Sequence, residues 1–120
     1  MDPLKQLFHE KATAQRNAIK TLLKEHGDLV VDQVTLSQIY GGARSIKMMV
    51  WETSELDAVE GIRFRGYSIP ELEKLLPKAP GGNEPLPEGL FWLMLVGEAP
   101  TAEEVQWLSK EWAKRSSVPQ

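Results

Sequence analysis

The chain has no cysteine and only two histidines among its 120 residues. The lack of cysteine excludes a disulfide framework and a thiolate nucleophile. His9 and His26 are too few and too far apart to indicate a metal site, and neither completes a catalytic set with a carboxylate pair or a hydroxyl nucleophile. His26 precedes Gly27 at a predicted helix end, where a cation interacts favourably with the helix dipole. The sequence therefore predicts no catalytic residue and no metal ligand.

The chain also lacks a strong charge of one sign and a long apolar run. Lys and Arg total 14 against 17 Asp and Glu, a formal net charge of -3, which disfavours nucleic acid as a partner. No apolar run approaches the roughly 18 to 20 residues of a membrane-spanning helix, and the N-terminus has no apolar signal core. We expect a soluble intracellular protein that binds neither nucleic acid nor a membrane.

What is present is mainly helical in its apolar spacing. Asp2-Pro3 is a helix start, because the Asp side chain accepts from free N–H groups and Pro gives up a donor that has no partner there. A stripe of Leu, Phe, Ala and Ile follows at helical spacing up to Gly27. This predicts one long amphipathic helix, which would not stay folded without something large to pack on.

Three further helices are predicted by their N-terminal caps. Each start places Ser or Thr three residues before Glu or Gln, the spacing of a capping box. The first helix is little more than one turn and stops at Gly41-Gly42, the second ends at Pro77, and the third carries an apolar stripe. The capping pairs are Thr35 with Gln38, Ser68 with Glu71, and Thr101 with Glu104.

The segment LFWLMLV, residues 90–96, has no polar face. A helix that is apolar all round is expected to be buried on every side. A chain of 120 residues has little with which to surround such a helix, so this segment indicates a larger protein. The preceding Pro- and Gly-rich stretch lacks the Gly-Lys-Ser/Thr of a phosphate loop and is predicted to be a turn.

Two strands are predicted in the middle of the chain, at 48–53 and 62–65, from alternating apolar and polar residues. The polar segment SELDAVEG, closed by Gly61, is expected to join them as a hairpin loop. Arg63 and Arg65 would then lie opposite Glu52, where a salt-bridge ladder is favoured over an anion site. Arg44 follows the glycine pair on irregular backbone, and either a bidentate grip on a phosphate or a structural ion pair fits it.

Four segments together resemble the N-terminal region of citrate synthase of the type found in mitochondria and in some bacteria. The resemblance runs from about Leu22 to Arg115, and EGIRFRGYSIPE with EPLPEGLFWL is its most specific part. The segments are YGGARSIK, ETSELDAVEGIRFRGYSIPE, LPKAPGGNEPLPEGLFWLM and WLSKEWAKR.

The resemblance implies a mainly α fold, in which residues 1–120 begin the helical large domain and contain one small β-hairpin. It implies a homodimer that condenses acetyl-CoA, a substrate rather than a cofactor, with oxaloacetate and water to give citrate and CoA. In the family an Asp removes a methyl proton, one His donates to the thioester oxygen and a second His activates oxaloacetate. Neither His9 nor His26 matches them, so the resemblance implies a non-catalytic fragment.

The resemblance also gives Arg44 a role, because the family has an arginine shortly after the YGG turn that contacts CoA phosphates. The sequence departs from the family nearby, with Ala43, Ser45 and Ile46 among residues where the family more often has Met and Gly. Localisation is implied to be cytoplasmic in a bacterium or the mitochondrial matrix in a eukaryote. Two alternatives stay open: a helical interaction module derived from the fold, and part of a 2-methylcitrate synthase.

Overall fold

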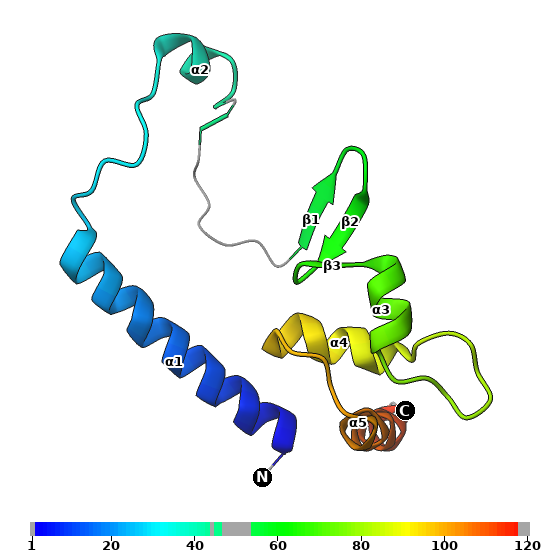
Figure 1. The fold of residues 1–120 in the computed structure, drawn as a ribbon. Helices are drawn as coiled ribbons and strands as arrows, with labels where there is room; N and C mark the ends of the chain where they lie inside the picture. Colours follow the sequence, from blue (N-terminus) through cyan, green and yellow to red (C-terminus); the bar gives the residue numbers. More distant parts are fainter. Residues whose placement is uncertain (1, 44, 47–53, 118–120) are drawn as a thin grey trace. The chain divides into compact units, whose positions relative to one another are not determined.

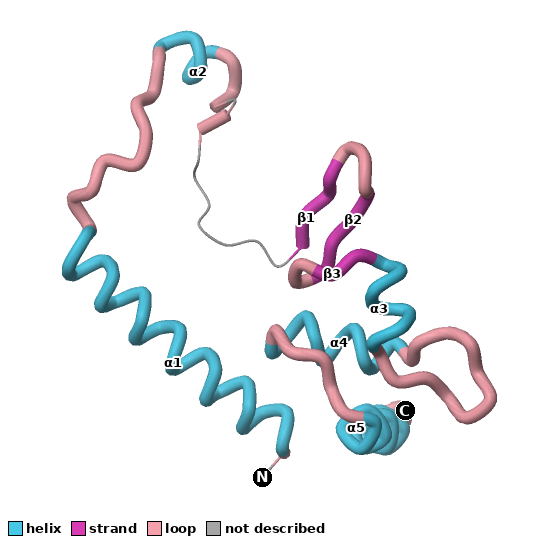
Figure 2. Tube along the Cα trace, viewed as in Figure 1, coloured by secondary structure: helices cyan, strands magenta, loops and turns pink. Residues whose placement is uncertain are grey.

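The computed structural model of the chain describes residues 2–43, 45–46 and 54–117. Five helices and three short strands follow one another along the chain (Figure 1; Figure 2), which confirms the mainly α prediction. The chain divides into two compact units: a first unit of residues 1–8 and 53–120, and a second unit of residues 9–52. The elements are α1 (Pro3–His26), α2 (Leu36–Tyr40), β1 (Ser54–Asp57), β2 (Gly61–Phe64), β3 (Tyr67–Ser68), α3 (Ile69–Leu75), α4 (Pro87–Val96) and α5 (Ala102–Arg115).

The long N-terminal helix has the start and the end that the sequence predicts. The Asp2 carboxylate accepts from the backbone N–H groups of Leu4 and Lys5, at 3.1 and 3.2 Å. The helix ends one residue before Gly27. None of the described residues of α1 is buried, although the side chains of its first two turns contact the core of the first unit.

The three predicted capping boxes are present, and each closes with a short hydrogen bond. The N–H of Thr35 donates to Gln38 Oε1 at 2.9 Å, and the N–H of Thr101 donates to Glu104 Oε2 at 2.7 Å. The N–H of Ser68 donates to a Glu71 carboxylate oxygen at 2.7 Å. Local hydrogen bonding therefore fixes where α2, α3 and α5 begin, in both units of the chain.

The hydrophobic core lies in the first unit, and α4 contributes to both of its clusters. Leu93 is fully buried against α3, and Trp92 is 2% exposed on the side toward α5. The first cluster is Leu72, Leu76 and Leu93, and the second is Trp92, Val96 and Leu108, on which Leu4, Leu7 and Trp107 pack.

The expectation that residues 90–96 are buried on every side is wrong for this chain. Phe91 is 42% exposed and Leu95 is 38% exposed, so α4 keeps one apolar side in solvent. The Phe91 ring meets the Trp112 ring edge to face, with centroids 5.2 Å apart, and this pair lies partly in solvent. Within the described residues, the neighbours of α4 leave this side of the helix uncovered.

The small sheet differs from the predicted hairpin. Its order is β1-β2-β3, antiparallel throughout, and Asp57 pairs with Gly61 at the turn. The predicted strand at 48–53 lies outside the described residues, whereas β1 lies inside the segment that we predicted to be the loop. The turn forms here because the Asp57 carboxylate accepts from the N–H groups of Val59 and Glu60, at 2.7 and 2.8 Å, and Gly61 has a φ of +89°.

The third strand was not predicted, and the second strand ends one residue early. Arg65 has a φ of 51° and belongs to the turn that leads through Gly66 into β3. Because β3 has only two residues, no alternation of apolar and polar side chains signals it in the sequence. Within the described part of the chain, no helix combines the length and the apolar character needed to cross a membrane.

Candidate functional site

Arg44, the candidate CoA contact, lies outside the described residues, so its role stays a prediction. The backbone on both sides of it is described. Helix α2 ends at Tyr40, and Gly42, Ala43 and Ser45 all have positive φ, at 81°, 62° and 59°. Such angles are uncommon for residues with a Cβ atom and occur mostly in tight turns. The residues that flank Arg44 therefore form an irregular turn, as the glycine pair predicts.

The two histidines both lie on the first helix and are exposed. His26 is the last residue of α1, the position at which a cation interacts favourably with the helix dipole. Within the described residues, no group of three His, Asp or Glu side chains is arranged to hold a metal ion.

The predicted salt-bridge ladder between Arg63, Arg65 and Glu52 stays a prediction, because Glu52 is not among the residues that the structure describes. Among the described residues, Arg63 pairs with Glu60 at 2.5 Å and approaches Glu71 at 3.9 Å. The hydrogen bond and the charge of Glu60 raise the pKa of Arg63. Hydrogen bonds from Ser68 hold the pKa of Glu71 below its usual value. The contacts of Arg63 and Glu71 therefore stabilise the β1–β2 turn and the first turn of α3.

Arg65 has a different partner, the C-terminal end of α4. Its Nε and Nη2 atoms donate to the carbonyl oxygen of Met94, at 3.1 and 2.5 Å. The Arg65 guanidinium also lies 4.0 Å from where a side chain on Gly97 would begin, and Gly97 ends α4 with a φ of +81°. A cation at a helix C-terminus is favourable for two reasons: it donates hydrogen bonds to a carbonyl of the last turn, and its charge interacts favourably with the helix dipole. Arg65 therefore ties the sheet to the central helix of the core.

A buried carboxylate that the sequence did not reveal joins α4 to α5. Glu88 is only 9% exposed, and its Oε1 accepts a hydrogen bond of 2.7 Å from the Ser109 hydroxyl. Its Oε2 is also buried and has no hydrogen-bond partner among the described residues. A signal was available, since Ser109 lies one turn beyond Val105 and beside Leu108 on the apolar stripe of α5.

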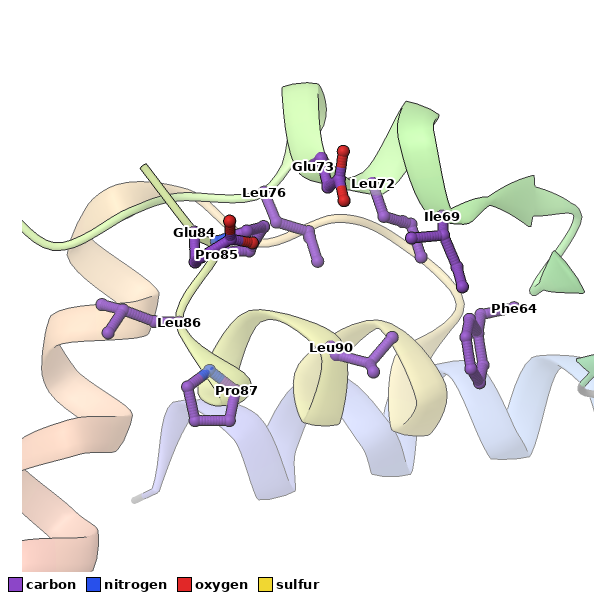
Figure 3. Close-up of a pocket in the computed structure, with 10 residues that line it drawn as sticks. All are labelled: Phe64, Ile69, Leu72, Glu73, Leu76, Glu84, Pro85, Leu86, Pro87 and Leu90. Atoms are coloured by element: carbon purple, nitrogen blue, oxygen red, sulfur yellow. The ribbon is translucent and has the colours of Figure 1, made fainter. Parts of the chain in front are cut away.

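An apolar groove runs between α3 and α4 (Figure 3). Its volume is about 300 Å³, and Leu72 of α3 and Leu76, which directly follows α3, point toward Leu90 of α4. The Pro- and Gly-rich connection closes one end of the groove, held as a turn by the Leu86 N–H, which donates to the Pro77 carbonyl at 3.0 Å. The other residues that line it are Phe64, Ile69, Glu73, Glu84, Pro85, Leu86 and Pro87. The lining is apolar except for the carboxylates of Glu73 and Glu84.

Comparisons with known proteins identify the family. The family model described as citrate synthase, C-terminal domain, matches residues 42–120, well over half of the chain. The chain belongs to the citrate synthase family. It is 64% identical over 116 residues to the mitochondrial citrate synthase of Neurospora crassa, 61% to that of Aspergillus niger and 59% to that of Emericella nidulans. Each match covers 97% of this chain.

The match covers a much smaller share of the relatives. The chain spans 25% of the Neurospora crassa citrate synthase and 24% of each of the other two. The family resemblance of the four sequence segments is thereby confirmed over nearly the whole chain. The described residues supply a packed core, an exposed helix and irregular backbone on both sides of Arg44, but no assembled set of acid and base groups.

Proposed function

We propose that this chain is the N-terminal quarter of a citrate synthase polypeptide, and that the complete polypeptide condenses acetyl-CoA with oxaloacetate. The observation that carries the proposal is the identity of 64% across 97% of the chain, combined with coverage of only 25% of the relative. Identity at that level over a whole segment reflects a shared fold, and three relatives share one enzyme name.

In the proposed reaction, acetyl-CoA loses a methyl proton to a base, and its methyl carbon forms a bond to the carbonyl carbon of oxaloacetate. Water then cleaves the thioester of the citryl-CoA, which gives citrate and CoA. The acid and base groups would come from the three quarters of the enzyme that this chain does not include. The first unit of this chain would act as a folded platform, with its core built around α4.

Arg44 is proposed to hold a CoA phosphate in the complete enzyme. The positive φ of Ala43 and Ser45 supports this, because the described residues on either side of Arg44 lack the backbone angles of a regular helix or strand. A guanidinium binds two phosphate oxygens at once, which gives it an advantage over an ammonium group at such a site.

The complete enzyme is proposed to be a homodimer in the mitochondrial matrix. The relatives support this location, since all three are named mitochondrial citrate synthases and come from fungi. The homodimer rests on the family resemblance of the sequence. Sedimentation of the complete protein measures its mass in solution. The mass of a single subunit would contradict the homodimer.

A chimera tests the proposed function directly. This chain would replace the 116 matched residues of the Neurospora crassa enzyme, and release of CoA from acetyl-CoA and oxaloacetate would be measured. We expect activity within about tenfold of the parent enzyme, because the replaced segment differs at only about a third of its positions. A soluble, folded chimera without activity would contradict the proposal and favour a non-catalytic interaction module. A chimera that prefers propionyl-CoA would indicate a 2-methylcitrate synthase.

In the same chimera, Arg44→Ala tests the phosphate contact. Losing one charge-assisted hydrogen bond costs about 1.5 to 3 kcal/mol, so KM for acetyl-CoA should rise about tenfold or more while KM for oxaloacetate stays the same. The KM of Arg44→Lys for acetyl-CoA should lie between those of the unchanged chimera and Arg44→Ala, because Lys keeps the charge but not the bidentate geometry. Arg16→Ala, which removes an exposed arginine from α1, is the matched control. An unchanged KM for acetyl-CoA in Arg44→Ala would remove the proposed contact.

A further inference from the structure

The apolar stripe of α1 begins inside the core of the first unit. Leu4 and Leu7 pack against the cluster of Trp92, Val96 and Leu108. At 3.6 residues per turn, Leu22 follows Leu4 after about five turns and lies on the same side of the helix. One side of α1 therefore starts in a packed interface and continues past it.

Beyond the first two turns, this stripe is uncovered. Ile19 is 48% exposed, Leu22 is 52% exposed and Leu23 is 63% exposed, although all three lie on the apolar side of the helix. Large apolar side chains that gather on one helix face indicate a surface for another protein segment. The helix also has no buried residue of its own among those described, and an isolated helix has little stability without packing.

We infer that Ile19, Leu22 and Leu23 form a docking surface for the remaining part of a citrate synthase polypeptide, and that the separate 120-residue chain binds that part in trans. The inference rests on the proposed function. Two observations carry it: the stripe is continuous with an interface already formed by Leu4 and Leu7, and the relatives extend to about four times the matched length. The occupant is therefore the polypeptide that continues the same hydrophobic core.

The experiment supplies the two parts separately. This chain would be produced together with the part of the Neurospora crassa citrate synthase that follows its 116 matched residues. The two polypeptides should purify as one complex that contains them in a one-to-one ratio. Mass spectrometry of the intact complex measures that ratio. If both parts are soluble and stay apart at micromolar concentration, the inference is overturned.

Leu22→Glu tests the surface itself, because it places a charge in the centre of the stripe. The variant loses the favourable free energy of burying one Leu side chain. We therefore expect it to bind the remaining polypeptide at least about tenfold more weakly. Asn17→Glu is the matched control, since it adds the same charge to the same helix on the opposite side. Circular dichroism of both variants checks that α1 is equally helical in each. Equal binding by the two variants would contradict the assignment of this side.

The two proposals fail in different ways. A complex that forms with the expected dependence on Leu22 but releases no CoA supports the docking surface and counts against the enzymatic function. An active covalent chimera whose stability is unchanged by Leu22→Glu supports the function and overturns the docking surface. Binding that is sensitive to Leu22 in an active complex supports both.

Discussion

The two units of this chain have similar local order and very different packing. Among the described residues of the first unit, seven Leu, Val and Trp side chains are buried, and α4 lies between α3 and α5. In the second unit, none of the described residues is buried, and Leu29, Val30 and Val31 are 69 to 78% exposed. Yet α2 in the second unit has the same kind of capping box as α5 in the first.

The difference separates what local sequence can do from what a core does. A capping box satisfies free backbone N–H groups and sets where a helix begins, whether or not the helix packs on anything. Stability requires apolar surface to be removed from water, and the described residues that do this lie in the first unit. We therefore expect the first unit to unfold cooperatively, while the described helices of the second unit contribute little to that transition.

The largest expected effect comes from Leu93→Ala. Leu93 is fully buried between α3 and α4, and truncation of such a residue leaves a cavity that costs about 2 to 5 kcal/mol. Leu22→Ala is the matched change in the second unit, where the side chain is already half exposed, so its effect on the isolated chain should be within about 0.5 kcal/mol. Urea unfolding followed by tryptophan fluorescence measures both. Equal losses would contradict the contrast between the units.

A smaller effect is expected from Arg65→Ala, which tests the tie between the sheet and α4. The change leaves the Met94 carbonyl without its two N–H donors and should lower the free energy of unfolding by about 1 to 3 kcal/mol. Arg65→Lys should recover part of the loss, because an ammonium still reaches a C-terminal carbonyl. Chemical denaturation of the three proteins provides the comparison, and no loss in Arg65→Ala would show that the contact contributes nothing.

The caps give a paired test across the two units. Thr101→Ala removes the cap of α5, which packs on the core, and should cost about 0.5 to 2 kcal/mol. Thr35→Ala removes the equivalent cap of α2, whose residues are not buried, and should leave the cooperative transition where it is. Thermal unfolding followed by circular dichroism distinguishes them. A shift in Tm from Thr35→Ala as large as that from Thr101→Ala would mean that the two units unfold together.

The smallest effect concerns pH and the β1–β2 turn. Hydrogen bonds from the N–H groups of Glu60 and Val59 hold the pKa of Asp57 below its usual value. A lowered pKa in the folded state means that the ionised form stabilises the turn above about pH 4, and that this contribution is lost as the pH falls through the folded pKa. An NMR titration of the Asp57 carboxyl should have its midpoint below about 3.9. A midpoint above that value would contradict the turn geometry.

Asp57→Asn provides the control for that titration. Glu71 also has a lowered pKa, caused by hydrogen bonds from Ser68, and so contributes to the same acid range. The variant should therefore reduce the acid dependence of the sheet without removing it, and Glu71→Gln should reduce the remainder.

Sequence reasoning found the helices because their signals are local. The caps at Thr35, Ser68 and Thr101 each depend on a residue three positions away. It misplaced β1, because the hydrogen bonds from Val59 and Glu60 to Asp57 turn the chain inside a segment that reads as a polar loop.

Contacts across long sequence distances were the part that the sequence did not reveal. The Arg65 guanidinium reaches a carbonyl 29 residues away, and the Glu88–Ser109 hydrogen bond spans 21 residues. The spacing of apolar and polar residues along one helix or strand does not indicate contacts between residues so far apart in the sequence. For the candidate site, the glycine pair predicts irregular backbone next to Arg44 and leaves a phosphate contact and a structural ion pair equally open. The choice of CoA as the ligand came from the family resemblance.

Amide hydrogen exchange tests the central contrast most directly. In the separate chain, amides of α4 and α5 should be protected to the level of cooperative unfolding, and amides of residues 9–26 in α1 should exchange close to the rate of an unpacked helix. Addition of the remaining citrate synthase polypeptide should raise protection in α1 and leave α4 and α5 nearly unchanged. Strong protection of residues 9–26 in the chain alone, at the level of α4, would contradict the account.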